Sequence, residues 1–222
     1  MREFDIEQAS LHVKWNYVKL LSALPVTGTE AFGVLCDKLA PFGLSASKIL
    51  LEAPSTKLGD VVLTIILLDG RLDIKFWISS FEIIIHELYE DDEQNVVDIA
   101  KIIFEALEKI DQNAEKGTAN IRLMYHLKLV PGETAKFLLE HLKDTPQLTP
   151  EMAIYQKNVD GMKALQNVRV AFAKSLAYDD ALFLDVNLNY SQIDDVVAFK
   201  DTITQDVYDI WKDLGLKDLV AD

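Results

Sequence analysis

The sequence predicts an α+β protein built as a tandem duplication, in which each unit is a strand, a helix, a meander of three or four antiparallel strands and a long helix. Two observations carry this prediction. Apolar residues recur at helical spacing in two pairs of segments roughly a hundred residues apart, and alternating segments typical of strands lie between them in the same order. The units span residues 1–115 and 116–222. We expect them to pack with pseudo-twofold symmetry, with the helices on one face of a curved antiparallel sheet.

The long helices are the clearest repeated feature. One begins after the acidic run Glu90–Glu93 and the other after Asp194 and Asp195, where carboxylates cap free N–H groups and suit the positive end of the helix dipole. Glycine follows each helix, at Gly117 and Gly215. The two apolar stripes match position for position: Val96, Ile99, Ile103, Leu107 and Ile110; Val196, Phe199, Ile203, Val207 and Ile210.

A pair of shorter helices repeats in the same way. They open at Gly28-Thr29-Glu30 and at Gly132-Glu133-Thr134. Their apolar faces share the spacing i, i+3, i+4, i+7: Phe32, Leu35, Cys36 and Leu39; Ala135, Leu138, Leu139 and Leu142.

Strands fill the remaining sequence. An alternating strand precedes each short helix, at residues 11–17 and 121–128. Further strands are expected near Lys48–Glu52, Val61–Leu68, Arg71–Ile78, Phe81–Leu88, Met152–Lys157, Val168–Lys174 and Ala181–Tyr190, with one short strand of the second unit lost or merged. Asp69-Gly70 is a hairpin signal. Because Val61–Leu68 is apolar on both faces, we expect it to be buried on both sides where the units join.

This order of elements is similar to that of duplicated saddle-shaped folds such as the TATA-binding protein, and more loosely to helix-grip and secretion-chaperone folds. The resemblance lies in topology alone and is accompanied by no diagnostic residues. It implies an arrangement of sheet and helices, and no function is transferred from it.

Composition limits the classes of partner. Of the 222 residues, 50% are hydrophobic and 26% charged, which is typical of a globular protein, and the net charge is −14. Such a charge argues against direct binding of nucleic acid and against docking on anionic lipid, because both need clustered cations. It fits a partner protein with a basic surface, or it serves only to keep the protein soluble.

Several features point to a reducing compartment. The single cysteine, Cys36, excludes an intramolecular disulfide. The first residues carry no signal-peptide pattern, and the longest apolar stretches are too short to span a bilayer. We therefore expect a cytoplasmic protein that does not bind a membrane.

No segment carries a recognisable catalytic, metal or cofactor motif. His12 and His126 lie on the polar side of corresponding strands, without ligand-type residues at suitable spacing on those strands. Tyr178-Asp179-Asp180 fits an ordinary polar hairpin turn, and nucleophile elbows and phosphate-binding glycine loops are missing. The sequence thus favours a protein that is not an enzyme and names no catalytic residue, metal ligand or cofactor.

Aromatic residues on the polar side of two strands are the best candidates for partner contact. Trp77 shares its side with Arg71, Asp73 and Lys75, while Leu72, Ile74, Phe76 and Ile78 form the inward set. Phe183 shares its side with Asp185, Asn187 and Asn189. These aromatics either contact a partner or pack between the two units.

Three hypotheses follow. The first is a non-catalytic, acidic protein-binding module: an adaptor, a chaperone-like partner or a subunit of a larger assembly. The alternative is a small-molecule-binding or enzymatic domain of the helix-grip kind, whose pocket between long helix and sheet is lined by Trp15, Tyr125, Tyr190 and Trp211. The third is a subunit of a larger assembly in which one face of the paired units repeats the contact, and the sequence also allows a homo-oligomer.

Overall fold

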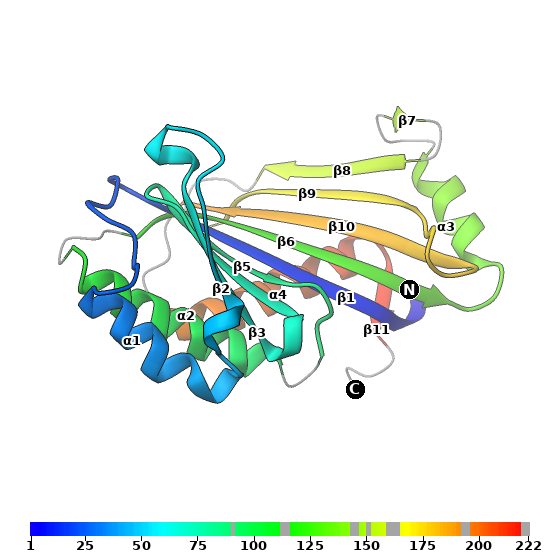
Figure 1. The fold of residues 1–222 in the computed structure, drawn as a ribbon. Coiled ribbons are helices and arrows are strands. Elements are labelled where there is room, and N and C mark those ends of the chain that lie inside the picture. Colours follow the sequence, from blue (N-terminus) through cyan, green and yellow to red (C-terminus); the bar gives the residue numbers. More distant parts are fainter. Residues whose placement is uncertain are drawn as a thin grey trace.

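The computed structural model describes residues 1–89, 92–111, 116–142, 147–149, 152–158, 165–191 and 196–218. The described strands form one sheet, in the order β2-β3-β4-β5-β1-β6-β10-β9-β8-β7, and the short β11 also pairs with β1. Neighbours in this order are antiparallel, whereas β11 runs parallel to β1. Figure 1 shows this sheet with α1, α2 and α4 below it and α3 beside one end of the strands of the second half, and the strands of the two halves diverge because the sheet is twisted.

The first half of the chain contains a long strand, a short helix, four strands and a long helix. Their bounds are β1 Arg2–Tyr17, α1 Glu30–Leu39, β2 Ile49–Glu52, β3 Val62–Leu67, β4 Leu72–Phe76, β5 Ser80–Ile85 and α2 Asp92–Glu108. Thr29 caps α1 by accepting the Phe32 N–H at 3.1 Å. The hairpin predicted at Asp69-Gly70 joins β3 to β4, with positive φ at both residues.

The second half has the same order of elements. Their bounds are β6 Lys116–Leu129, α3 Glu133–Leu142, β7 Gln147–Thr149, β8 Met152–Asn158, β9 Leu165–Lys174, β10 Ala181–Tyr190, α4 Val196–Asp213 and β11 Leu216–Asp218. The strand expected to be lost or merged is present as β7. At three residues it is too short for its alternation to be seen in the sequence.

The two halves meet through β1 and β6, which pair antiparallel from Phe4↔Leu129 to Tyr17↔Lys116. The prediction that Val61–Leu68 lies at this junction is wrong. The corresponding strand β3 is largely buried on both faces, but it lies next to the edge strand β2. Apolar residues on both faces of a strand indicate burial, and they do not identify the strand's neighbours.

Gly117 does not end a helix, as the sequence suggested, but lies within β6. A Cβ atom at this position would come within 2.7 Å of the Asn16 carbonyl oxygen, so the close approach of β1 and β6 requires glycine there. Gly215 does follow α4, with φ +71°, which glycine adopts without strain.

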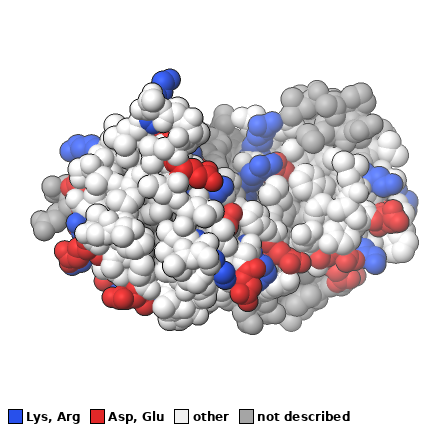
Figure 2. Space-filling model, viewed as in Figure 1, with Lys and Arg blue, Asp and Glu red and all other residues white. Residues whose placement is uncertain are grey.

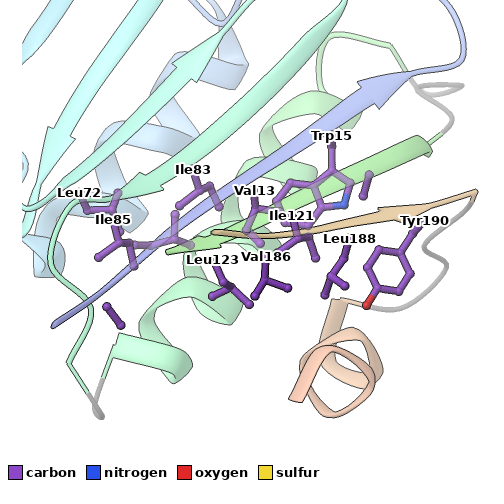
Figure 3. Close-up of a cluster of buried hydrophobic side chains, with 14 of the residues drawn as sticks. Val13, Trp15, Leu72, Ile83, Ile85, Ile121, Leu123, Val186, Leu188 and Tyr190 are labelled. Atoms are coloured by element: carbon purple, nitrogen blue, oxygen red, sulfur yellow. The ribbon is translucent and has the colours of Figure 1, made fainter. Parts of the chain in front are cut away.

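The hydrophobic core lies between the sheet and the helices. Trp15 stacks on Phe81 with ring centroids 4.8 Å apart, and both rings meet Phe104 of α2 edge to face. Trp211 of α4 contacts Phe4 and Tyr125 in the same way. In Figure 3 the buried side chains of β1, β5, β6 and β10 form one continuous layer.

Helix α3 packs against the same side of the sheet. Its Phe137 meets Phe172 of β9, and Phe172 lies opposite the buried Leu184 of β10. All four described α-helices therefore cover one face, and this position decides which residues remain open on the other.

Candidate functional site on the helix-free face of the sheet

The helix-free face is the side of the six central strands that no described helix covers. Two rows of directly opposed residues cross it from β4 to β9. We call them the asparagine row and the arginine row. The asparagine row is Lys75, Glu82, Lys14, Asn120, Asn189 and Asn167. The arginine row is Asp73, Ile84, His12, Arg122, Asn187 and Arg169.

Glu82 is the most enclosed charged group on this face, with its side chain only 11% exposed. Its carboxylate accepts a hydrogen bond from Lys14 Nζ at 2.9 Å, and its second oxygen lies 3.0 Å from His12 Nε2. Burial alone would raise the pKa of Glu82. The hydrogen bonds and charges of His12 and Lys14 outweigh burial and lower this pKa to about 2.

A second charged pair lies in the other half of the face. Arg122 donates from Nε and Nη2 to the two carboxylate oxygens of Asp185, each at 2.8 Å. Asn187 donates to the same carboxylate at 3.1 Å. A bidentate pair of this kind fixes both side chains in one geometry, so this part of the surface is preorganised.

Three asparagines form a hydrogen-bonded chain across three strands. Asn120 donates to the carbonyl oxygen of Asn189 at 2.5 Å, and Asn189 donates to Asn167 at 2.6 Å. Each carboxamide still has hydrogen-bonding capacity beyond these contacts, because it carries two N–H groups and two lone pairs. The chain therefore offers both donors and acceptors to a molecule laid across it.

An aromatic corner lies at the far end of β6 and β10. The His126 ring contacts those of Phe183 and Tyr178, both with centroids 5.2 Å away, and its Nδ1 is 2.9 Å from Ser175 Oγ. Burial lowers the pKa of His126, which favours the neutral ring. The Tyr178 hydroxyl lies 3.3 Å from Gln8 Oε1 across the sheet.

The two rows carry nearly balanced charge. They and the adjoining Asp185 contribute four cations (Lys14, Lys75, Arg122 and Arg169) and three carboxylates (Asp73, Glu82 and Asp185). Helices α2 and α4 together carry nine acidic and three basic residues, so among the described residues the acidic excess is concentrated in the helix layer. Figure 2 shows charges of both signs interspersed over the side drawn.

The structure brings together part of the contact set predicted from sequence. Asp73 and Lys75 are half-buried on the helix-free face, and Trp77 follows them with its ring centroid 5.6 Å from Lys14 Nζ. Arg71 is directed elsewhere, since its guanidinium pairs with buried Asp92 at the start of α2, at 2.7 Å.

Phe183 lies on the same face but far from Trp77. Its neighbour across the strands is His126, which faces Gln8 of β1, whereas Trp77 lies over Lys14. Six residues of extended strand separate Gln8 from Lys14, or about 20 Å. The two aromatics therefore mark opposite borders of the face.

The aromatics proposed to line a pocket form part of the core instead. Trp15 and Tyr190 are almost fully buried, and the Tyr190 hydroxyl donates to Asp206 of α4 at 2.8 Å. Tyr125 and Trp211 contact each other with centroids 5.6 Å apart. These side chains fill space between helix and sheet and fix α4 in place.

Within the described ranges, no group of three or more histidine, cysteine or carboxylate side chains is arranged to hold a metal ion. None of the helices described here is long and apolar enough to cross a membrane. His86 pairs with Asp73 at 3.2 Å, and Cys36 of α1 is partly buried. Burial raises the pKa of the Cys36 thiol, which disfavours the reactive thiolate.

The sequence patterns did not reveal the charged and amide clusters at the centre of the face. Glu82 lies within the predicted strand Phe81–Leu88 and Arg122 within the predicted strand at residues 121–128, and neither was identified as a site residue. Strand alternation places each residue on the correct side. Only the pairing of β1 with β6 shows that the two halves form one surface.

Comparisons with known proteins do not assign the chain to a family. No family description matches it, and no curated protein resembles it in sequence. Among solved structures, a rolling circle replication initiator protein from Geobacillus stearothermophilus aligns with a TM-score of 0.34 and 9% identity, over 92% of this chain and 80% of that protein. Similarity at this level does not establish a shared fold, and no function is drawn from it.

Proposed function

We propose that this protein is a non-catalytic protein-binding module, an adaptor or chaperone-like partner, and that its partner covers the helix-free face. The main support is the composition and order of that face. It presents Trp77, Arg122, Met124 and Phe183, the residue types enriched in protein interfaces, around a network of paired polar groups. Preformed pairs lower the cost of binding, because fewer side chains must be ordered when a partner arrives.

Charge favours a protein partner over nucleic acid. Two of the four cations in the rows, Lys14 and Arg122, are already neutralised by Glu82 and Asp185. A phosphate backbone would have to break these pairs or bind beside carboxylates. The net charge of −14 adds repulsion at long range.

A partner with a basic surface is part of the proposal. Helices α2 and α4, on the opposite face, carry nine acidic and three basic residues, and their field would attract such a partner over a distance without contacting it. Attraction between opposite charges would speed association and make it sensitive to salt. A cytoplasmic location, with Cys36 reduced, completes the proposal.

We also propose that residues 1–115 and 116–222 are duplicated units related by a pseudo-twofold axis between β1 and β6. The strand order supports this idea, because β5, β4, β3 and β2 follow outward from β1 as β10, β9, β8 and β7 follow from β6. The two halves would then supply equivalent strands to one binding face.

The test is affinity capture of the tagged full-length chain from its native host at low and at high salt. Partners are identified by mass spectrometry. We expect a stoichiometric partner protein that is lost at high salt and also lost with Trp77→Ala. Tyr208→Ala is the matched control, because Tyr208 is an exposed aromatic on α4, outside this face. Recovery that responds to neither salt nor Trp77→Ala would contradict the proposal.

A further inference from the structure

The edge strand β2 is unusually apolar for an unprotected sheet edge. Strand β2 is the outermost strand beyond β3, so one side of its backbone has no described neighbour. Leu50 and Leu51 are 42% and 60% exposed, and Leu58 in the following loop is 62% exposed. Exposed edges are normally guarded by charges, bulges or proline within the strand, because free N–H and C=O groups attract another strand.

Charges occur only at the two ends of this segment. The sequence from Lys48 to Glu52 places a cation first, three apolar residues in the middle and an anion last. Glu52 is exposed, and no ion pair links it to a described cation. Among the described residues, Lys48 has a 3.5 Å contact with the fully exposed Asp69 and donates a 3.3 Å hydrogen bond to the Gly43 carbonyl.

This pattern is complementary to itself when reversed. If a second copy is aligned antiparallel about Leu50, Lys48 faces Glu52 of the other copy at both ends. Ile49 then faces Leu51, and Leu50 faces its own counterpart. We propose that β2 pairs with β2 of a second copy of this chain in this register, forming a twofold-symmetric dimer.

The proposed pairing of two β2 strands keeps the helix-free side of one copy next to the helix-free side of the other. Leu50 lies opposite Thr64, which lies opposite Lys75 of the asparagine row, so Leu50 and Glu52 project on the helix-free side. Lys48 ends the short 3-10 turn Ala46–Lys48 directly before β2, next to the strand end where it would meet Glu52 of the other copy. A twofold axis perpendicular to the sheet keeps both helix layers on the same side. The dimer would therefore join two helix-free faces into one continuous surface.

The contact involves only five residues from each copy, so we expect it to be weak. It buries less than the roughly 1,200 Å² found in stable complexes, which suggests a dissociation constant of about 10 μM to 1 mM. Sedimentation velocity over that concentration range, with the full chain alone, measures it directly. We expect the wild type to shift from monomer to dimer as concentration rises.

Substitutions at partly exposed positions test the site without disturbing the core. Leu50→Lys places two lysines opposite each other at the axis and should abolish the dimer. Leu139→Lys is the matched control, because Leu139 on α3 is 61% exposed and lies outside β2. This variant should dimerise like the wild type. Circular dichroism melting confirms that both variants remain folded.

A charge exchange tests the register itself. Glu52→Lys and Lys48→Glu each create like-charge contacts at both ends and should weaken dimerisation at least tenfold, whereas the double variant restores the pairs and the affinity. A wild type that stays monomeric throughout, a Leu50→Lys variant that still dimerises, or a double variant as weak as the singles would each overturn the proposal. Its failure would leave the proposed protein-binding function standing, because that function is tested by partner capture and Trp77→Ala.

Discussion

Replacing Glu82 by glutamine shows how much the charged cluster on the helix-free face contributes to stability. Glutamine keeps the size of the side chain but removes the charge that Lys14 and His12 share. A hydrogen bond to a charged group contributes about 1.5–3 kcal/mol. Because Lys14 and His12 are 39% and 32% exposed, solvent screens both contacts, and we expect a combined loss of about 1–2 kcal/mol in the free energy of unfolding.

The loss of stability caused by Glu82→Gln should decrease as the pH is lowered. The pKa of Glu82 is about 2 in the folded protein, below its ordinary value of 4.5, which applies to the unfolded chain. The carboxylate therefore stabilises the fold fully above pH 4.5, and this contribution is lost as the pH falls toward 2. The difference between wild type and Glu82→Gln should shrink over that interval.

Urea unfolding followed by tryptophan fluorescence, at about pH 7 and about pH 3, measures both quantities. Glu105→Gln is the control, because the Lys38–Glu105 pair is 48% and 41% exposed and should contribute less than about 0.5 kcal/mol. The reasoning is refuted if Glu82→Gln is as stable as the wild type at neutral pH, or if its deficit is unchanged in acid.

Further substitutions test the fold by the same unfolding measurement. Gly117→Ala should cost about 1–3 kcal/mol, because the new Cβ meets the Asn16 backbone, whereas Gly33→Ala in the open face of α1 should stabilise by about 0.5–1 kcal/mol. Equal effects at the two glycines would contradict the close approach of β1 and β6. Thr29→Ala should cost about 1 kcal/mol through loss of the α1 cap, and a neutral result would count against that cap. Phe81→Ala should cost about 3–5 kcal/mol, and a loss below 1 kcal/mol would mean that the aromatic cluster is not packed as described.

Local patterns predicted much of the fold. The alternation of Leu72, Ile74 and Phe76 with Asp73 and Lys75 placed each side chain on its observed face, because successive residues of a strand point in opposite directions. The helices were equally visible, since α2 buries Ile99, Ile103 and Leu107 from the predicted stripe.

These local patterns could not predict which distant strands pair with each other. Residues on one strand carry no information about which strand lies beside them, so Val61–Leu68 was assigned to the wrong place and the β1–β6 junction was not identified. The candidate site depends on that junction. Lys14 and Asn120 face each other only because strands more than a hundred residues apart in the sequence are neighbours in the sheet.

The most direct test of the central claim is hydroxyl-radical footprinting of the chain with and without its captured partner. Trp77, Met124 and Phe183 report on the helix-free face, and Tyr208 on α4 reports on the helix layer. We predict that the partner protects Trp77 and Met124 from oxidation much more than Tyr208. Protection of Tyr208 with Trp77 and Met124 unchanged would show that the partner binds the helices, and would contradict the assignment of the helix-free face as the binding surface.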